Sequence, residues 1–183
     1  MRLSSTFIRA LAHVASALLL TAVSLTATAA DADATPNADA IAALRAENEH
    51  LRTLIPSQSH AMMDVAYHFT NLWFAGTKAN WPLAQFYFNE SRSHIQWAVR
   101  LVPVRKSSHG DVHLEEMFTA FDGTLLTDLK NRIAAKDQAG FKIAYKAALA
   151  GCNSCHTASE KPYLKITIPA RQEVQIVDFD PHN

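Results

Sequence analysis

The only two cysteines of the 183-residue chain, Cys152 and Cys155, stand three positions apart near its end, and His156 directly follows the second. A disulfide between such close residues would close almost no loop and would stabilise the fold little. A thioredoxin-type redox pair belongs to a strand-helix-strand unit, which this sequence does not show. A structural zinc site needs four ligands, and this motif offers three crowded together.

The remaining interpretation of the Cys-x-x-Cys-His pattern is covalent attachment of a c-type haem. Two thioethers, from Cys152 and Cys155, would reach the vinyl groups on one edge of the porphyrin, and His156 would bind the iron beneath the ring. The sequence therefore predicts one covalent haem c with its iron, held by these three residues.

The N-terminal region has the features of a secretory signal peptide. A positively charged start precedes an apolar run over roughly residues 10–25, and small residues in an Ala-x-Ala arrangement follow it. We expect residues 1–30 to be cleaved near Ala29 or Ala30 and the mature chain to be periplasmic, since c-type haem is attached outside the cytoplasm. An uncleaved anchor is disfavoured, because the run is shorter than the roughly 20 strongly apolar residues of a membrane span.

The composition excludes several classes of function. The chain has 17 basic and 17 acidic residues and no basic stripe, which argues against a nucleic-acid partner. No segment after the signal peptide is apolar enough to predict a membrane span. No Ser/His/Asp arrangement or carboxylate pair predicts hydrolytic catalysis, so we expect no enzyme. Glycine is scarce, with 5 residues in 183, which favours helices.

The elements that must position the cysteine motif are predicted to be helices. Apolar residues at three- and four-residue spacing predict an all-α fold with four helices of about 20 residues over 57–161. Short loops between them make successive helices antiparallel neighbours, as in a four-helix bundle. We expect Ser57 or Ser59 to cap the first helix, Asn80 the second and Asp137 the fourth.

The segments around the predicted bundle have different patterns. Residues 31–37 are predicted to be a polar linker, 38–56 a short coiled-coil-like helix, 104–111 a polar loop and 162–183 an extended tail. The helix has heptad spacing with an Asn at an a-type position, which favours a parallel homodimer. Folding back on its own bundle is the alternative. The predicted dimer seam consists of Ile41, Leu44, Asn48, Leu51 and Ile55.

A Cys-x-x-Cys-His motif late in the chain, after four predicted helices, resembles the class II c-type cytochromes, the cytochrome c′ group. The resemblance covers residues 57–161, and its specific part is the sequence GCNSCH at the motif. It implies a four-helix bundle with the haem near the end of the last helix, His156 as the proximal ligand, and single-electron transfer with redox partner proteins. The heptad helix and the long tail depart from the family's usual pattern, and the tail can cover a haem edge.

The same resemblance points to the first bundle helix as the source of the sixth iron ligand. Low-spin members of the class use a methionine near the start of this helix, so Met62 is the first candidate and Met63 the second; packing is the alternative for both. His60 and His68 are further candidates. Ligation by Met62 predicts an electron carrier, whereas an open site predicts a five-coordinate protein that binds NO or CO.

Three further residues enter the predictions through the helical faces on which they lie. Phe69 shares the apolar face of Met62, and Tyr145 shares that of Cys152, so both are candidate haem-pocket residues. Glu90 lies on an otherwise apolar face and is expected to be partly exposed; pairing with Arg92, Arg100 or a haem propionate is the alternative.

A third hypothesis for the function is a haem subunit that docks to a partner through its N-terminal helix.

Overall fold

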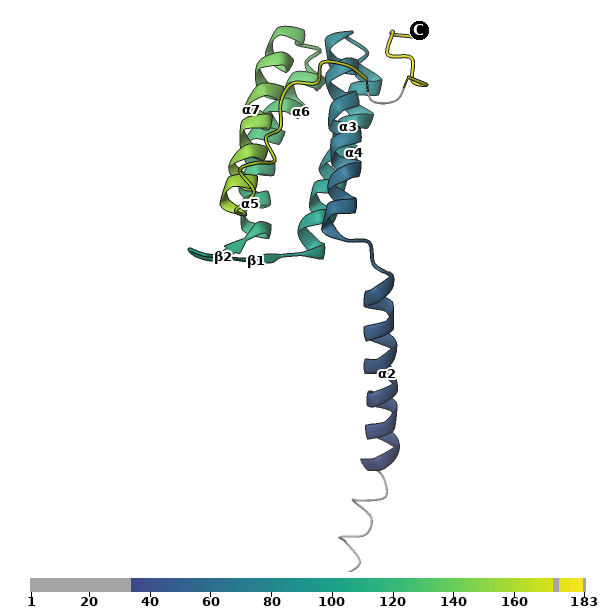
Figure 1. Cartoon of the computed structure of the whole chain (residues 1–183). Helices are drawn as coiled ribbons and strands as arrows, with labels where there is room; N and C mark the ends of the chain where they lie inside the picture. The colour runs from purple at the N-terminus through teal and green to yellow at the C-terminus, as the bar shows by residue number, and fades with distance from the viewer. Residues whose placement is uncertain (1–33, 173–174, 183) are drawn as a thin grey trace, which may run out of the picture. The chain divides into compact units, whose positions relative to one another are not determined.

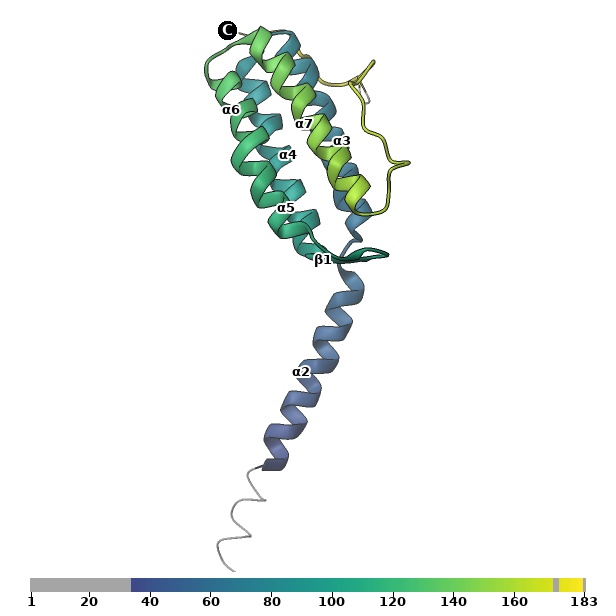
Figure 2. The ribbon, with the colours of Figure 1, turned by 90° about the vertical axis from the view of Figure 1, so that its left-hand side faces the viewer.

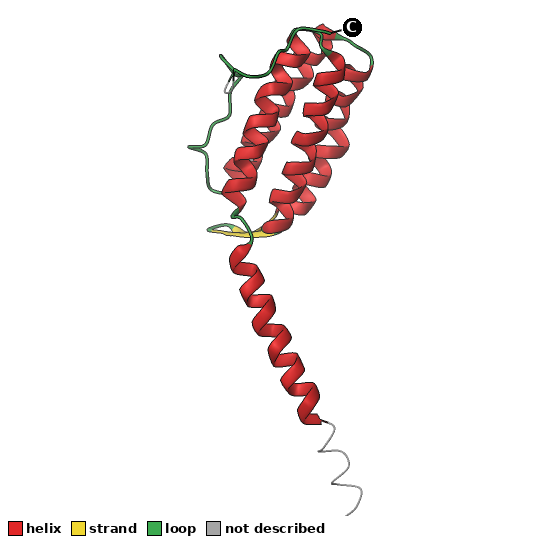
Figure 3. Cartoon of the chain, turned by 90° about the vertical axis from the view of Figure 1, so that its right-hand side faces the viewer, coloured by secondary structure: helices red, strands yellow, loops and turns green. Residues whose placement is uncertain are grey.

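The computed structural model describes residues 34–172 and 175–182 (Figure 1). The expected signal peptide, residues 1–30, and its cleavage position lie outside these residues. The described part is mostly helical (Figure 3), which confirms the all-α prediction. It separates into two units between Ile55 and Pro56, which are described in turn. Among the described residues, no helix combines the length and the apolar character needed to cross a membrane.

The first unit contains helix α2, Ala34–Leu54. It begins four residues before the expected start at residue 38, so the predicted linker was wrong over residues 34–37. Pro36 is compatible with this earlier start, since proline is tolerated in the first turn of a helix. The apolar residues of the predicted dimer seam are exposed, with exposed fractions between 42% and 68% for Ile41, Leu44, Leu51 and Ile55.

The second unit begins with two long antiparallel helices, α3 (Gln58–Thr77) and α4 (Trp81–Leu101), which lie side by side (Figures 1 and 2). Ser57 accepts a hydrogen bond from an amide of the first turn of α3 at 3.4 Å, and Asn80 does the same for α4 at 3.3 Å. Both predicted N-caps are therefore confirmed. These side chains satisfy amides that have no partner within the helix.

A short antiparallel hairpin follows α4, with strands β1 (Val104–Ser107) and β2 (Gly110–His113). The prediction of an irregular loop over 104–111 was wrong here. Gly110 turns the chain with a φ of 118°, in the region that glycine adopts without strain. The Ser108 amide at the hairpin tip donates to the Glu160 carboxylate at 2.7 Å, which ties the hairpin to the end of the last helix.

The third helical rod is made of three consecutive elements: α5 (Leu114–Phe121), the π-helix η1 (Asp122–Leu126) and α6 (Thr127–Ala134). The sequence predicted one helix here. A π-helical segment bonds each residue to the fifth along, and the apolar spacing does not reveal it. Arg92 of α4 donates two hydrogen bonds of 2.6 Å to Asp122, and these bonds join the π-helix to α4.

Helix α7 (Gln138–Ala158) is the last helix and begins at the predicted cap, where Asp137 accepts from the Gly140 amide at 2.9 Å. The core between the helices of this unit is apolar. Gly76 lets α3 approach α7, because a Cβ atom there would lie 2.2 Å from the ring of Phe141. The largest fully buried apolar side chains are Leu72, Phe88, Leu126, Leu129, Ile133, Phe141, Tyr145 and Phe179.

The described residues after α7 form a tail without helices or strands, which runs back along α7 toward the opposite end of the unit (Figures 1 and 2). Its Phe179 is 1% exposed and packs between Phe74 and Tyr87, with ring centroids 5.9 and 6.3 Å away. The Asn80 amide group also donates to the carbonyls of Phe179 and Asp180 at 3.3 and 3.0 Å. The far end of the tail is therefore fastened in the core.

Candidate functional site

The cysteine motif lies in the last two turns of α7, and neither Cys152 nor Cys155 forms a disulfide. Both residues are half-buried. Burial raises the pKa of the Cys152 thiol to about 12 and also raises the pKa of Cys155. Thiols that attack disulfides need a lowered pKa, so this environment does not favour a redox pair.

The imidazole of His156 is oriented by the tail. Its Nδ1 atom lies 2.8 Å from the carbonyl oxygen of Leu164. A carbonyl oxygen only accepts hydrogen bonds, so Nδ1 is the donor in this contact, and in the neutral imidazole the lone pair is then on Nε2. Metal-binding histidines in proteins have this arrangement, in which the second nitrogen donates to a carbonyl or a carboxylate.

Asn153, between the two cysteines, holds the tail beside His156. Its Nδ2 atom donates to the carbonyl of Ile166 at 2.9 Å, and its Oδ1 atom accepts from the amide of the same residue at 2.7 Å. This double contact fixes the tail two residues after Leu164. Sequence reasoning allowed for a tail that covers a haem edge but missed Asn153, because spacing alone does not constrain the two residues inside the motif.

Two aromatic stacks set the register between α3 and α7. Phe69 stacks on Tyr145 with centroids 4.6 Å apart, and Trp73 stacks on Phe141 at 6.3 Å. A step of four residues forward along α3 thus corresponds to four residues backward along α7. Because all α-helices rise equally per residue, this antiparallel register extends toward the end of α7 that carries the cysteines.

The register brings Met62 level with Cys152, since the two residues are each seven positions from the Phe69–Tyr145 stack. Met62 is half-buried, whereas Met63 is 66% exposed. His60 is exposed at the start of α3. Of the candidate iron ligands near the start of α3, Met62 is thus the one whose side chain is not exposed to solvent.

The two predicted pocket residues pack against each other in the core. Phe69 is 5% exposed and Tyr145 is 1% exposed, and the Tyr145 hydroxyl donates to the Phe69 carbonyl at 2.8 Å. Burial raises the pKa of Tyr145 above its usual range. These residues therefore form a closed apolar layer two helical turns before Cys152.

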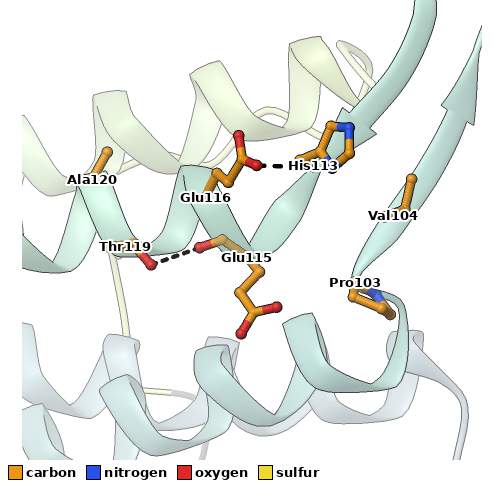
Figure 4. A pocket seen from close by; sticks show the side chains of 7 residues that line it. All are labelled: Pro103, Val104, His113, Glu115, Glu116, Thr119 and Ala120. Carbon is orange, nitrogen blue, oxygen red and sulfur yellow. Dashed lines mark hydrogen bonds and ion pairs between the residues drawn. The ribbon is translucent and has the colours of Figure 1, made fainter.

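A surface pocket lies at the hairpin end of α5, and Figure 4 shows the side chains that line it. Glu116 lies 4.0 Å from the His113 ring, and the Thr119 hydroxyl donates to the Glu115 carbonyl at 2.9 Å. These side chains are exposed, and the motif residues of α7 are not among those that line the pocket. The pocket is therefore separate from the candidate haem site.

The remaining predicted site residues lie between α3 and α4. His68 contacts His94, with ring centroids 4.8 Å apart, and Glu90 lies 3.9 Å from the same histidine. Glu90 is partly exposed, as expected, and the alternative partner Arg92 pairs with Asp122 instead.

Comparison of the chain with protein-family models, curated proteins and solved structures finds no match.

Proposed function

We propose that the chain is a periplasmic mono-haem c-type cytochrome with a class II four-helix bundle, which carries single electrons between redox partner proteins. The observation that carries this proposal is the hydrogen bond between His156 Nδ1 and the Leu164 carbonyl. In the neutral ring this bond directs the lone pair to Nε2, and the two cysteines of the motif form no disulfide. A histidine prepared in this way beside a thiol pair fits haem c better than a redox or zinc site.

Each residue of the motif has a separate role in this proposal. Cys152 and Cys155 hold the porphyrin through thioether bonds, and their half-buried positions keep these bonds away from solvent. His156 would offer Nε2 to the iron, with its ring orientation set by the tail. Haem c, when bound, supplies an iron that changes its charge by one electron.

The choice of electron transfer over gas binding rests on Met62. It is half-buried on α3, level with Cys152, and a thioether is a soft ligand that favours ferrous iron. We propose that Met62 closes the sixth position of the iron. The neighbouring Met63 is 66% exposed and serves as a matched control.

Haem attachment is tested by expressing the full chain with its own leader in a bacterium that matures c-type cytochromes. We expect the haem to stay with the protein through denaturation and acid-acetone extraction. Cys152→Ala and Cys155→Ala should each leave a single thioether and lower the yield. Ser154→Ala, between them on the exposed side of α7, should change neither result. Complete loss of haem from the wild-type protein on extraction would exclude the proposal.

The sixth ligand is tested by the spin state of the ferric protein. The wild type should be low-spin and should take up carbon monoxide slowly. Met62→Ala should become high-spin and bind carbon monoxide rapidly, whereas Met63→Ala should behave as the wild type. A wild-type protein that is already high-spin would reject the carrier function and favour the gas-binding alternative.

A further inference from the structure

A cluster of metal-ligand side chains lies between α3 and α4, away from the cysteine motif of α7. Asp64 and His68 are four residues apart on α3, and Glu90 and His94 are four apart on α4. Residues at this spacing share one face of a helix. The antiparallel packing brings the two faces together, so that one ligand atom each from His68, Glu90 and His94 lies within 4.8 Å of the other two.

The separations in the cluster match an ion-sized gap better than direct pairing. His94 Nε2 lies 4.0 Å from Asp64 Oδ2, which is too long for a hydrogen bond. A tetrahedral ion with bonds of about 2.1 Å holds its ligand atoms about 3.4 Å apart. The separations in the cluster, which are at most 4.8 Å, therefore exceed those around a bound ion by no more than about 1.4 Å.

His94 is already oriented for ligation. Its Nδ1 atom lies 2.8 Å from the backbone carbonyl of Glu90, which places the ring proton on Nδ1. In the neutral ring the lone pair is then on Nε2, the nitrogen that lies 4.0 Å from Asp64 Oδ2. A backbone carbonyl that fixes the tautomer of a histidine is the usual outer support of a metal ligand.

His68 has an unsatisfied polar atom. Its Nδ1 atom is buried and has no hydrogen-bond partner among the described residues. A buried nitrogen without a partner is unfavourable and rare in native proteins. A metal ion would satisfy the free nitrogen.

The surroundings provide an apolar wall and an opening. The rings of Tyr67 and Tyr87 lie 5.1 and 6.0 Å from the His68 ring, and they shield its protein side. The side chains of Asp64 and Glu90 are 46% and 37% exposed, so an ion can enter from solvent between them. The site is thus half-buried, with carboxylates at its mouth.

We infer that His68, Glu90 and His94 bind one divalent transition-metal ion, with Asp64 as a further oxygen ligand at the solvent side. Two imidazoles and carboxylates suit zinc, copper, nickel or iron and do not suit calcium or magnesium, which prefer oxygen ligands alone. This ligand set is separate from His156 and the cysteines, so the site does not depend on the proposed haem function.

The inference is tested by titrating the full mature protein with ZnCl₂ in a calorimeter, without a histidine tag. We expect one equivalent to bind, and His68→Gln, His94→Gln or Glu90→Gln to weaken binding by at least about tenfold. His113→Gln is the matched control, because His113 lies 4.0 Å from Glu116 in an exposed histidine–glutamate pair outside the cluster. It should leave the affinity unchanged.

X-ray absorption at the zinc edge gives an independent measurement, since haem iron does not contribute there. Two imidazole ligands per zinc are expected in the wild type, and one in His94→Gln. Absence of one-equivalent binding would overturn the inference, as would binding that Glu90→Gln and both histidine variants leave intact. Because Glu90→Gln keeps the shape of the side chain, a loss of binding in a variant with wild-type circular dichroism reports ligation.

Discussion

Asn153→Ala removes the contact that holds the tail beside His156. The two hydrogen bonds between Asn153 and the backbone of Ile166, of 2.9 and 2.7 Å, are lost, and the helix itself is unaffected because alanine favours helices. Each such bond contributes about 0.5–1.5 kcal/mol, so the attachment of the tail weakens by about 1–3 kcal/mol. The Leu164 carbonyl then leaves the His156 ring for much of the time.

The consequence for a bound haem is a higher reduction potential. A hydrogen bond from Nδ1 to a carbonyl makes the imidazole a stronger donor and stabilises ferric iron. If the whole of one hydrogen bond, about 0.5–1.5 kcal/mol, acts on the ferric state, its loss raises the potential by roughly 20–65 mV for a one-electron couple. We expect a rise within this range.

If the chain holds haem as proposed, spectroelectrochemical titration measures this shift, and Ser154→Ala is the matched control. Ser154 also lies between the cysteines, but its hydroxyl donates at 3.1 Å to the Ala150 carbonyl of its own helix and does not touch the tail. Hydrogen exchange of the Ile166 amide supplies a second measurement that needs no haem, and the variant should lose its protection. An unchanged or lowered potential together with lost protection would refute the proposed effect of the tail on His156.

Three further predictions concern the stability and assembly of the chain. Phe179→Ala should lower the free energy of unfolding by about 3–5 kcal/mol in denaturant titration, because this ring is 1% exposed; Ile176→Ala, at 87% exposure, should change it little. If the exposed residues of α2 pair two chains, the mature chain should sediment as a dimer and a chain that starts at Ser57 as a monomer. A shortened chain that keeps the oligomeric state of the mature chain would contradict this pairing. The Gly140 amide holds the pKa of Asp137 below its usual range, so its carboxylate stabilises the fold above the unfolded pKa and loses this effect as pH falls through the lowered value. Asp137→Asn should therefore destabilise the protein at pH 7 in thermal melts but not at strongly acidic pH.

Much of the helical architecture was predictable because it depends on local signals. Apolar spacing located α3, α4 and α7, and the caps Ser57, Asn80 and Asp137 mark where they begin. A cap bonds to amides within its own first turn, so a few neighbouring residues suffice to recognise it. The Cys-x-x-Cys-His motif is likewise recognised from five neighbouring residues.

The errors occurred where local signals are weak or misleading. The strands β1 and β2 are four residues each and largely exposed, so their mutual pairing, and not an apolar pattern, defines them. The π-helix η1 inserts one extra residue per turn without breaking the helix. Helix α2 continues through Pro36, where composition had suggested a linker.

The contacts that specify the candidate sites come from tertiary structure. The acid–histidine pair of each helix is visible in the sequence, but only the packing of α3 on α4 places His68 beside Glu90 and His94. Likewise, the sequence alone identified His156 as a ligand candidate, whereas its partner Leu164 belongs to a tail whose extended pattern does not indicate which helix it contacts. Such contacts depend on which faces of separate segments meet, and that is settled by burial of the whole apolar core.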